Sequence, residues 1–357
     1  MRILVINCGS TTLKYKLFAI DQRSIQRLTG GVLEISRGYR ACITQLLDTL
    51  PEAPDAIAHR VVHGGDQSAD VLLVDIPLLN QLRELGSLAP LHNGPALEGI
   101  EATLGVGVPI IAAFDTAFHR TLPPCAWRYP LPDLPGIRRY GFHGWSHRFV
   151  VERYAELSGN PVPTLITLHL GSGCSAAAIR LGKSIDTSMG LTPLEGLVMG
   201  SRPGDLDPGI LMHLLQQGMT FDRLRSLLNH ESGLQGLAGT SDMRELLRRT
   251  DDAAALAVEI FCYRVLKYVG AYWAVLGGAE AIVFTGGIGE NSPEIRRRIS
   301  EGLGWTGLEI DEPRNSGGEE RISTPSSRPA VYNIRTDEEL LIAREVSGLL
   351  DARRVPG

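Results

Sequence analysis

The sequence predicts an α/β fold with mixed sheets, built from two similar halves. Apolar runs of strand length alternate with helical patterns along the chain, which is typical of sheets that are flanked by helices. Residues 4–18 and 165–179 each have the outline of a strand, a tight turn and a second strand. Superimposing Asn7 on His169 aligns Gly9 with Gly171 at an offset of 162 residues, almost half of the 357-residue chain. We interpret this match as an internal duplication.

The other elements are justified by the same patterns and by their end signals. Apolar runs bounded by glycine or polar residues predict buried strands at 56–58 with 61–62, at 108–114 and at 281–284. Caps and breakers predict helices from Asn93 to about Gly105, over 143–157, from Asp251 or Asp252 to Gly277, and onward from Pro293. Residues 285–291 are expected to form a glycine-rich loop, and residues 313–329, which are rich in Pro, Ser and Gly, a surface loop.

Composition narrows the class of protein. Hydrophobic residues make up 43% and charged residues 21%, which argues against a disordered or fibrous chain. The net charge of −5 comes without a basic stripe, so we expect no nucleic-acid partner. No apolar run reaches the length that spans a bilayer, and five scattered cysteines without a C-x-x-C pair favour reduced thiols. We expect a cytoplasmic protein without a membrane partner or a signal peptide.

Three small-residue turns follow apolar strands and are candidates for phosphate binding. They are residues 9–12, 171–173 and 286–289, and such turns can point consecutive N–H groups at phosphate oxygens. Lys14 follows the first turn and can reach a phosphate as a point charge. Neither a G-x-x-x-x-G-K-[ST] loop nor a strand-linked G-x-G-x-x-G occurs in the sequence. Each turn alone could be a plain hairpin, but the three together favour a phosphoryl ligand.

Charged and polar residues gather at glycine-flanked strand ends. Arg60 precedes Gly64-Gly65, Asp115 ends a strand, His143 begins a helix and Arg202 lies in a polar loop. Arginine forks match two oxygens of a carboxylate or phosphate at once. Two arginines, a histidine and an acid are the groups that phosphoryl transfer needs, because the protein mainly positions reactants and neutralises charge there.

At this point the sequence resembles a known family, the acetate kinases. Residues 7–16, NCGSTTLKYK, are similar to the N-terminal signature of that family, and residues 186–196, DTSMGLTPLEG, with the Arg202 loop, are similar to its second signature. The segments HRVVHGG, PLHN, FDTAFH, GFHG, TGGIGEN and TDEEL follow in the order of the family. The resemblance covers nearly the whole chain.

The resemblance implies the duplicated actin-like, or ribonuclease H-like, fold of sugar kinases and heat-shock chaperones, with the active site in the cleft between two lobes. The N-terminal lobe would comprise residues 1–147 with about 338–357, and the C-terminal lobe residues 148–337, including the dimerisation surface. It also implies a homodimer that transfers the γ-phosphoryl group of ATP reversibly to acetate, giving acetyl phosphate and ADP. Mg²⁺ would be the cofactor, with Mn²⁺ as a substitute, and ATP the co-substrate.

Residue roles are implied by the matching positions. Arg60 would bind the acyl substrate, with Arg202 beside it on the transferring group. His143 would stabilise the transition state, and Asp115 would act as the catalytic acid or orient Arg60. The methyl group would lie among Val62, Leu91, Phe142 and Pro193. Asn7 and Glu338 would hold the metal. ATP would contact Ser10, Thr12, Lys14, His169, Leu170, Gly171, Ser172, Gly173, Asp242, Met243, Arg244, Gly286, Gly287, Ile288, Gly289, Glu290 and Asn291.

Two alternatives stay open, and four departures from the family pattern accompany them. The chain could be a propionate or butyrate kinase of the same family, because a methyl-sized pocket discriminates by only about 1–3 kcal/mol per methylene. It could also be a non-catalytic ATP-binding sensor with the actin-like fold. Ser172 stands where asparagine is usual, Trp145 replaces a small residue, Gly94 is an additional residue, and the segment between Lys14 and Arg60 is short.

Overall fold

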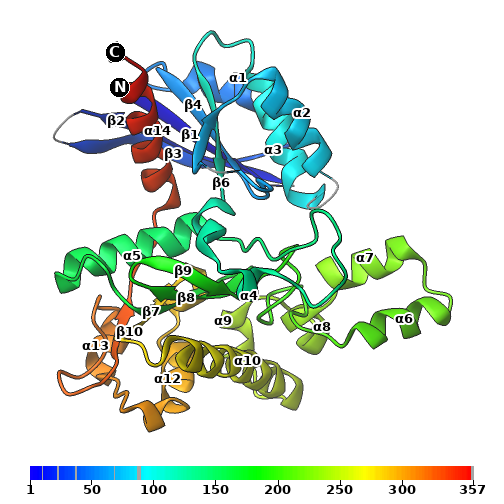
Figure 1. Ribbon diagram of the computed structural model, residues 1–357, viewed down its shortest axis with the longest axis vertical. Helices are drawn as coiled ribbons and strands as arrows, with labels where there is room; N and C mark the ends of the chain where they lie inside the picture. Colours follow the sequence, from blue (N-terminus) through cyan, green and yellow to red (C-terminus); the bar gives the residue numbers. More distant parts are fainter. Residues whose placement is uncertain (10, 22–23, 37, 68, 87–89, 355–357) are drawn as a thin grey trace. The chain divides into compact units, whose positions relative to one another are not determined.

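The computed structural model describes residues 1–9, 11–21, 24–36, 38–67, 69–86 and 90–354, without the side chains of residues 90–92 and 354. The chain divides into two compact units (Figure 1). Unit 1 comprises Met1–Arg120, Phe142–Trp145 and Asp337–Gly357, and unit 2 comprises Thr121–Gly141 and Ser146–Thr336.

Unit 1 is built on a six-stranded sheet with the order β3-β2-β1-β4-β6-β5. The strands are β1 (Arg2–Cys8), β2 (Thr12–Ile20), β3 (Ile25–Glu34), β4 (Ala56–Val61), β5 (Val71–Leu73) and β6 (Ile110–Phe114). β1, β2 and β3 are antiparallel neighbours, whereas β4 and β6 extend the sheet in the parallel direction. Strand β1 is apolar on both faces because helices cover both, and Ile3, Leu4, Val5 and Ile6 are fully buried.

Unit 2 repeats this topology, which confirms the predicted duplication. Its sheet has the order β11-β10-β7-β8-β9, formed by β7 (Leu165–Leu170), β8 (Cys174–Arg180), β9 (Lys183–Thr187), β10 (Ala281–Thr285) and β11 (Ala330–Asn333). β7, β8 and β9 are again antiparallel neighbours, and β10 and β11 again continue in the parallel direction. The order and directions of five strands therefore match in the two units, with β5 as an addition in unit 1.

The helices fill the connections between the strands. In unit 1 they are α1 (Tyr39–Thr49), α2 (Ile76–Leu85), α3 (Pro90–Thr103), the 3₁₀ turn Ala117–Thr121, which ends at the unit boundary, and α14 (Glu338–Arg354). In unit 2 they are α4 (Pro124–Trp127), α5 (Gly144–Ser158), α6 (Pro208–Gln216), α7 (Phe221–His230), α8 (Gly233–Ala238), α9 (Met243–Leu246), α10 (Asp252–Leu276), α11 (Gly286–Asn291), α12 (Pro293–Glu301), the 3₁₀ turn Gly304–Thr306 and α13 (Glu312–Gly317). The first two residues of α5 belong to unit 1.

Helix α10 agrees with its prediction, whereas α3 begins earlier than predicted. Asp251 caps α10 by accepting a hydrogen bond from the Ala254 N–H, and Gly277 ends the helix in the left-handed conformation. Helix α3 already begins at Pro90, so the prediction that Asn93 is its cap is wrong. The side chain of Asn93 is buried and bonds instead to the backbone N–H and carbonyl of His63, both at 2.9 Å. A long-range partner thus outweighs the local cap.

Two predicted loops contain regular structure. Residues 286–291 form helix α11 rather than an open loop. Residues 313–329 include most of α13, which is capped by the Asp311 carboxylate, and Ile322 and Ser323 are fully buried. The prediction of a surface loop is wrong for α13 and for the buried residues, whereas residues 316–320 are exposed. Arg296 of α12 donates to both the side chain and the carbonyl of Asn315 and holds α13 against α12.

The segment Thr121–Gly141 belongs to unit 2, although the sequence-based lobe boundary includes it in the N-terminal lobe. The Thr121 hydroxyl donates to the Ser184 carbonyl at 2.7 Å, and Tyr140 N–H donates to Gly190 O at 3.0 Å. These bonds tie the segment to the sheet of unit 2 and to the loop that follows it.

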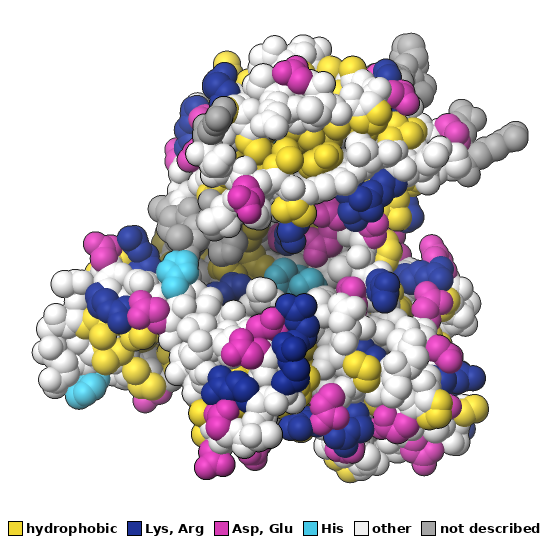
Figure 2. Space-filling view, turned by 180° about the vertical axis from the view of Figure 1, so that it is seen from behind, with side chains coloured by type: hydrophobic (Ala, Val, Ile, Leu, Met, Phe, Trp, Pro, Cys, Tyr) yellow, Lys and Arg dark blue, Asp and Glu magenta, His cyan; other side chains and the backbone are white. Residues whose placement is uncertain are grey.

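The surface mixes both signs of charge. Figure 2 shows acidic and basic side chains side by side across the face that is drawn. Among the described residues, no helix combines the length and the apolar character needed to cross a bilayer.

Candidate active site

Arg60 and Asp115 form an ion pair at the ends of two parallel strands of unit 1. Arg60 is on β4, and Asp115 directly follows β6 with its N–H bonded to Val61 O at 3.0 Å. Arg60 Nε donates to Asp115 Oδ1 at 2.7 Å, and its Nη2 donates to Oδ2 at 2.6 Å. The Asp115 side chain is only 1% exposed. This two-point geometry fixes the plane of the guanidinium.

A second carboxylate completes the surroundings of Arg60. Glu338 Oε2, at the start of α14, lies 3.4 Å from Arg60 Nε. Burial alone would lower the pKa of Arg60, but Asp115 and Glu338 outweigh it and raise that pKa. Burial raises the pKa of the Glu338 carboxyl, and the charge of Arg60 opposes that shift. Arg60 is therefore a permanently charged group with a fixed orientation.

His143 is held in a constrained backbone conformation beside Asp115. It is one of two described non-glycine residues with positive φ, at 57°, and it directly precedes α5. The next residue, Gly144, donates its N–H to Asp115 O at 3.0 Å. A Cβ at Gly144 would lie 2.0 Å from that oxygen, so glycine is required for this close approach. Such strain at a polar residue is typical of functional sites, and the adjacent helix N-terminus favours negative charge.

The predicted methyl pocket is only partly described, because its residues are divided between the units. Phe142 is 1% exposed in unit 1, its carbonyl bonds to His119 Nε2 at 3.1 Å, and the His63 ring packs edge-on at 5.6 Å. Val62 is half-buried just after β4. Leu91 lies in α3 with its side chain outside the described residues, and Pro193 is buried in unit 2. Their common pocket stays a prediction.

The two predicted metal ligands both lie in unit 1. Asn7 is on β1, and Glu338 begins α14, which packs on β1. An amide oxygen and a carboxylate suit Mg²⁺, which is commonly held by one or two protein carboxylates, waters and phosphate oxygens. No cluster of three or more acidic, His or Cys ligands is found in the described part of the chain. One amide oxygen and one carboxylate are a donor set that fits Mg²⁺.

The first glycine turn joins β1 to β2. Gly9 N–H bonds to Thr12 O at 2.8 Å, and Lys14 is exposed on β2 opposite Asn7 in the register. The positive charges of Lys14 and Lys16 both act on Glu338 and favour its ionised form. Ser10 lies outside the described residues. The predicted phosphate contacts of Thr12 and Lys14 stay predictions.

The second turn is packed against α11 in unit 2. His169, on β7, shares a 2.7 Å hydrogen bond between its Nδ1 and Ser146 Oγ. Gly171 N–H bonds to Gly173 O at 3.1 Å. Leu170 is fully buried, and a Cβ at Gly286, which has φ +78°, would lie 2.8 Å from its carbonyl oxygen. Only glycine lets α11 begin this close to the turn.

A cavity of about 740 Å³ opens beside this turn, which is a size typical of small-molecule sites. Eight predicted nucleotide residues line it, namely Gly171, Ser172, Asp242, Met243, Arg244, Gly287, Ile288 and Asn291. Five further lining residues were missed by the sequence reasoning, namely Ser241, Leu247, Ser292, Pro293 and Glu294. Their adjacency to the predicted segments 242–244 and 286–291 was the available signal.

An ion pair between Asp242 and Arg244 lies at one wall of the cavity, at the start of helix α9. Asp242 caps α9 by accepting from Arg244 N–H at 2.9 Å, and the Arg244 guanidinium donates to both oxygens of the same carboxylate. These hydrogen bonds, with the charge of Arg244, lower the pKa of Asp242 to about 2. The pair presents one exposed arginine to the cavity.

Glu290 is turned away from the lining of the cavity. Its Oε1 accepts hydrogen bonds from Thr285 Oγ1, Gly286 N–H and Thr336 N–H, at 3.2, 3.0 and 3.1 Å. It thereby ties α11 to the segment that leads into α14. Of the predicted nucleotide residues in unit 2, six do not line the cavity, namely His169, Leu170, Gly173, Gly286, Gly289 and Glu290, and their contacts with ATP stay predictions.

Arg202 is the second predicted arginine, and its surroundings differ from those of Arg60. It is half-buried in unit 2, and its Nη1 donates to the Pro193 carbonyl at 2.6 Å. Burial lowers the pKa of its guanidinium. Within the described ranges, no carboxylate forms an ion pair with Arg202. An uncompensated, partly desolvated cation of this kind favours an anion as its ligand, and the predicted contact of Arg202 with the transferring group stays a prediction.

Comparison with known proteins agrees with this geometry. A model of the Acetokinase family matches residues 41–344. The chain is 44% identical to the acetate kinase of Chloroherpeton thalassium, over 97% of this chain and 98% of that protein. It is 45% identical to the acetate kinase of Clavibacter michiganensis subsp. michiganensis, over 96% and 98%.

Solved structures give the same result. A propionate kinase from Francisella tularensis superposes with a TM-score of 0.89 at 38% identity, covering 96% of this chain and 98% of that chain. The acetate kinase of Porphyromonas gingivalis gives 0.87 at 36% identity, covering 98% and 99%. The duplicated sheets and these matches define the class, a kinase of α/β fold with two related lobes. Within that class, the chain belongs to the acetokinase family.

Proposed function

We propose that this chain is an acetate kinase, which transfers the γ-phosphoryl group of ATP reversibly to acetate and forms acetyl phosphate and ADP. The observation that carries the proposal is the pair of arginines at glycine-rich strand ends and loops, one held by Asp115 and the other without a carboxylate partner in the described chain. Membership of the acetokinase family supports the same activity.

In the proposed reaction, one acetate oxygen attacks the γ-phosphorus of ATP. The bond from that phosphorus to the β–γ bridging oxygen breaks, and its electron pair leaves with ADP. Arg60 binds the acetate carboxylate in the orientation that Asp115 imposes. Arg202 and His143 neutralise charge on the equatorial oxygens of the transferring group, where phosphoryl transfer gains most of its stabilisation.

ATP and a divalent metal complete the proposal. The cavity beside residues 171–172 receives the nucleotide, with Asp242, Arg244 and residues 287–291 around it. Asn7 and Glu338 would hold Mg²⁺, or Mn²⁺ in its place. When bound, the metal neutralises charge on the β- and γ-phosphates.

The activity is tested by trapping acyl phosphate with hydroxylamine. The purified enzyme is incubated with Mg²⁺ and each straight-chain carboxylate from formate to valerate, with ATP, GTP or pyrophosphate as the donor. We expect hydroxamate with acetate and ATP at the highest kcat/KM of the panel. ATP binding without hydroxamate from any carboxylate would contradict an enzymatic function and support the ATP-binding sensor.

A propionate kinase is the second candidate, because the propionate kinase of Francisella tularensis superposes so well on this chain. The same panel separates the two. If kcat/KM rises from acetate to propionate or butyrate, the longer carboxylate is the preferred substrate, since each added methylene is worth about 1–3 kcal/mol in a fitted apolar pocket.

We also propose a cytoplasmic homodimer. Helix α6 has no buried residue, and Ile210, Met212 and Leu215 are exposed along it, with Phe221 exposed at the start of α7. A second copy that covers this apolar face would account for it. Light scattering of the wild-type enzyme should give twice the mass of the chain, and Met212→Glu should shift it toward the monomer.

A further inference from the structure

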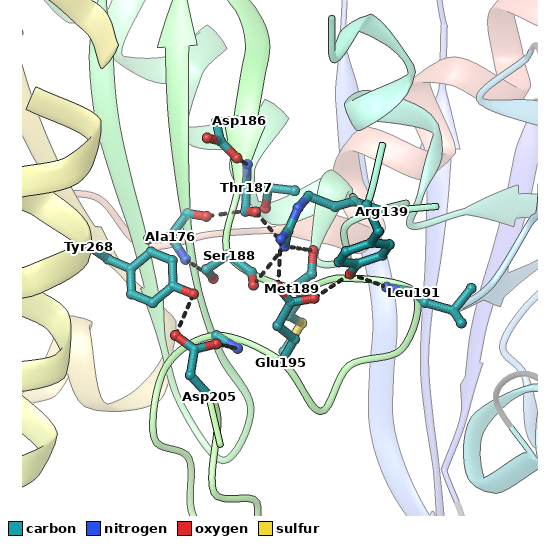
Figure 3. A network of polar contacts seen from close by, with 12 residues as sticks. Arg139, Ala176, Asp186, Thr187, Ser188, Met189, Leu191, Glu195, Asp205 and Tyr268 are labelled. Carbon is teal, nitrogen blue, oxygen red and sulfur yellow. Dashed lines mark hydrogen bonds and ion pairs between the residues drawn. The ribbon is translucent and has the colours of Figure 1, made fainter. Parts of the chain in front are cut away.

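The side chain of Arg139 connects several parts of the loop that follows β9 (Figure 3). Its Nη1 donates to the carbonyls of Thr187, Ser188 and Met189, each at 3.1 Å. Its Nη2 donates to Glu195 Oε1 at 2.5 Å. One planar guanidinium therefore binds both ends of residues 187–195, and it does so from a largely buried position, with a side-chain exposure of 15%.

The carboxylate of Glu195 is held from its other side by Tyr129. The Tyr129 hydroxyl donates to Glu195 Oε2 and accepts from Leu191 N–H at 3.1 Å. A Cβ at Gly190 would lie 1.8 Å from Glu195 Oε2 and 2.1 Å from the Tyr129 oxygen. The Glu195–Tyr129 contact therefore requires glycine at this position, and the loop cannot be closed in this way around a larger residue.

The loop closed by these contacts carries the partner of Arg202. Residues 190–194 lie between the two sets of Arg139 contacts, and the carbonyl of Pro193 accepts the 2.6 Å hydrogen bond from Arg202 Nη1. Beyond Glu195, Gly196 N–H donates to Asp205 Oδ1 at 2.9 Å, and Asp205 Oδ2 accepts from the Tyr268 hydroxyl at 2.8 Å. Arg202 thus lies in a loop that is held on both sides.

We propose that Arg139 and Glu195 are positioning residues for Arg202, which act by fixing residues 190–194 and hence the Pro193 carbonyl. The inference rests on the proposed function in one respect, because that function gives Arg202 its role in phosphoryl transfer. All of the residues involved belong to unit 2.

Arginine and glutamate are both needed for the chemistry of these contacts. A lysine at position 139 has one ammonium on a flexible stem and cannot reach three carbonyls and a carboxylate in one plane. Burial alone would lower the pKa of Arg139, but Glu195 outweighs it and raises that pKa. Glutamine at position 195 can still accept from Arg139, but its NH₂ group cannot accept the Tyr129 hydroxyl proton.

The kinetic test compares Arg139→Lys, Glu195→Gln and Tyr129→Phe, with Arg202→Lys alone and combined with Arg139→Lys. We expect kcat to fall roughly ten- to hundredfold in Arg139→Lys, less in Glu195→Gln and least in Tyr129→Phe. The KM for ATP should stay within about twofold, because the cavity of unit 2 is not touched. The double variant should lose much less than the product of the two single losses, since both act on the same guanidinium.

Ser327→Ala is the matched control for destabilisation. Ser327 is buried in unit 2, and its hydroxyl bonds to the backbone at Glu309 and Pro329. We expect it to lower the Tm without lowering kcat. The inference would be overturned if the fold-loss in kcat of Arg139→Lys/Arg202→Lys equalled the product of the two single losses. An unchanged kcat in Arg139→Lys would also overturn it.

A second measurement judges the same inference without catalysis. Amide hydrogen exchange of the full-length protein should be about tenfold or more faster at Leu191 in Arg139→Lys and Tyr129→Phe, with little change elsewhere in unit 2. Unchanged exchange at residues 190–196 would overturn the inference even if the enzyme is active. Absence of any acyl phosphate from the wild type, with faster exchange in the variants, would reject the proposed function and leave the loop contacts supported.

Discussion

Arg60 in unit 1 and Arg202 in unit 2 are held in opposite ways. Arg60 is bound at two points by Asp115 and approached by Glu338, so its charge is compensated before any ligand arrives. Arg202 bonds to the Pro193 carbonyl, and in the described part of the chain it has no carboxylate partner. A compensated arginine contributes orientation, whereas an uncompensated one contributes charge. We therefore expect Arg60 to serve mainly in binding acetate and Arg202 mainly in the chemical step.

Removing Arg202 should have the largest effect. Arg202→Ala deletes the uncompensated charge, and we expect kcat to fall by about 10³-fold or more, as for arginines that meet a transferring phosphoryl group. The KM for acetate should change far less. Steady-state hydroxamate kinetics with ATP and acetate measure both constants.

Arg202→Lys is the matched variant, because it keeps the charge and loses the planar fork. It should recover part of the lost kcat. An Arg202→Ala enzyme that keeps more than about a tenth of the wild-type kcat would contradict the expectation that Arg202 serves in the chemical step and Arg60 in binding.

Neutralising Asp115 should have the next largest effect. Asp115→Asn keeps the shape but removes the two-point ion pair, so Arg60 loses its fixed plane. We expect kcat/KM for acetate to fall about a hundredfold, mainly through KM. Urea denaturation should show about 3 kcal/mol less stability, because one partner of a largely buried pair is lost.

Asp70→Asn is the control for this effect, since Asp70 pairs with Arg120 elsewhere in unit 1. It should leave the acetate KM near the wild-type value. Equal falls in kcat and kcat/KM for Asp115→Asn, with the acetate KM unchanged, would mean that Asp115 acts in the chemical step as an acid, and not by orienting Arg60.

The duplication and most strands could be predicted because buried strands are continuous apolar runs in any sequence, with glycine turns between them. The start of α3 could not, because Asn93 bonds to His63, thirty residues away along the chain. Arg60, Asp115 and Arg202 were predictable as residue types at glycine-flanked positions. Arg139 and Glu195 were not, because they are 56 residues apart and share no motif. Polar contacts between residues far apart in the sequence therefore cannot be predicted from local patterns.

Replacing Glu338 should have the smallest effect on kcat at saturating metal. It should instead change how stability depends on pH and how the rate depends on the Mg²⁺ concentration. Burial raises the pKa of Glu338 above its usual 4.5. Above pH 4.5 the folded protein therefore holds this proton more tightly than the unfolded chain, and stability falls as pH rises through the raised pKa. Glu338→Gln cannot titrate, so its unfolding free energy should fall less over that window in urea titrations.

Glu338→Gln should also need several-fold more Mg²⁺ for half-maximal rate, because a carboxylate ligand becomes a neutral amide. Glu339→Gln is the matched control, since Glu339 lies in the same helical turn and pairs with Lys16 at 3.0 Å. An equal shift in Mg²⁺ requirement for both variants would mean that the general negative charge at the start of α14 matters. A shift in the Mg²⁺ requirement for Glu338→Gln alone would show that Glu338 binds the metal. Glu338 would then have a role beyond the one that it shares with Asp115, which is to compensate the charge of Arg60.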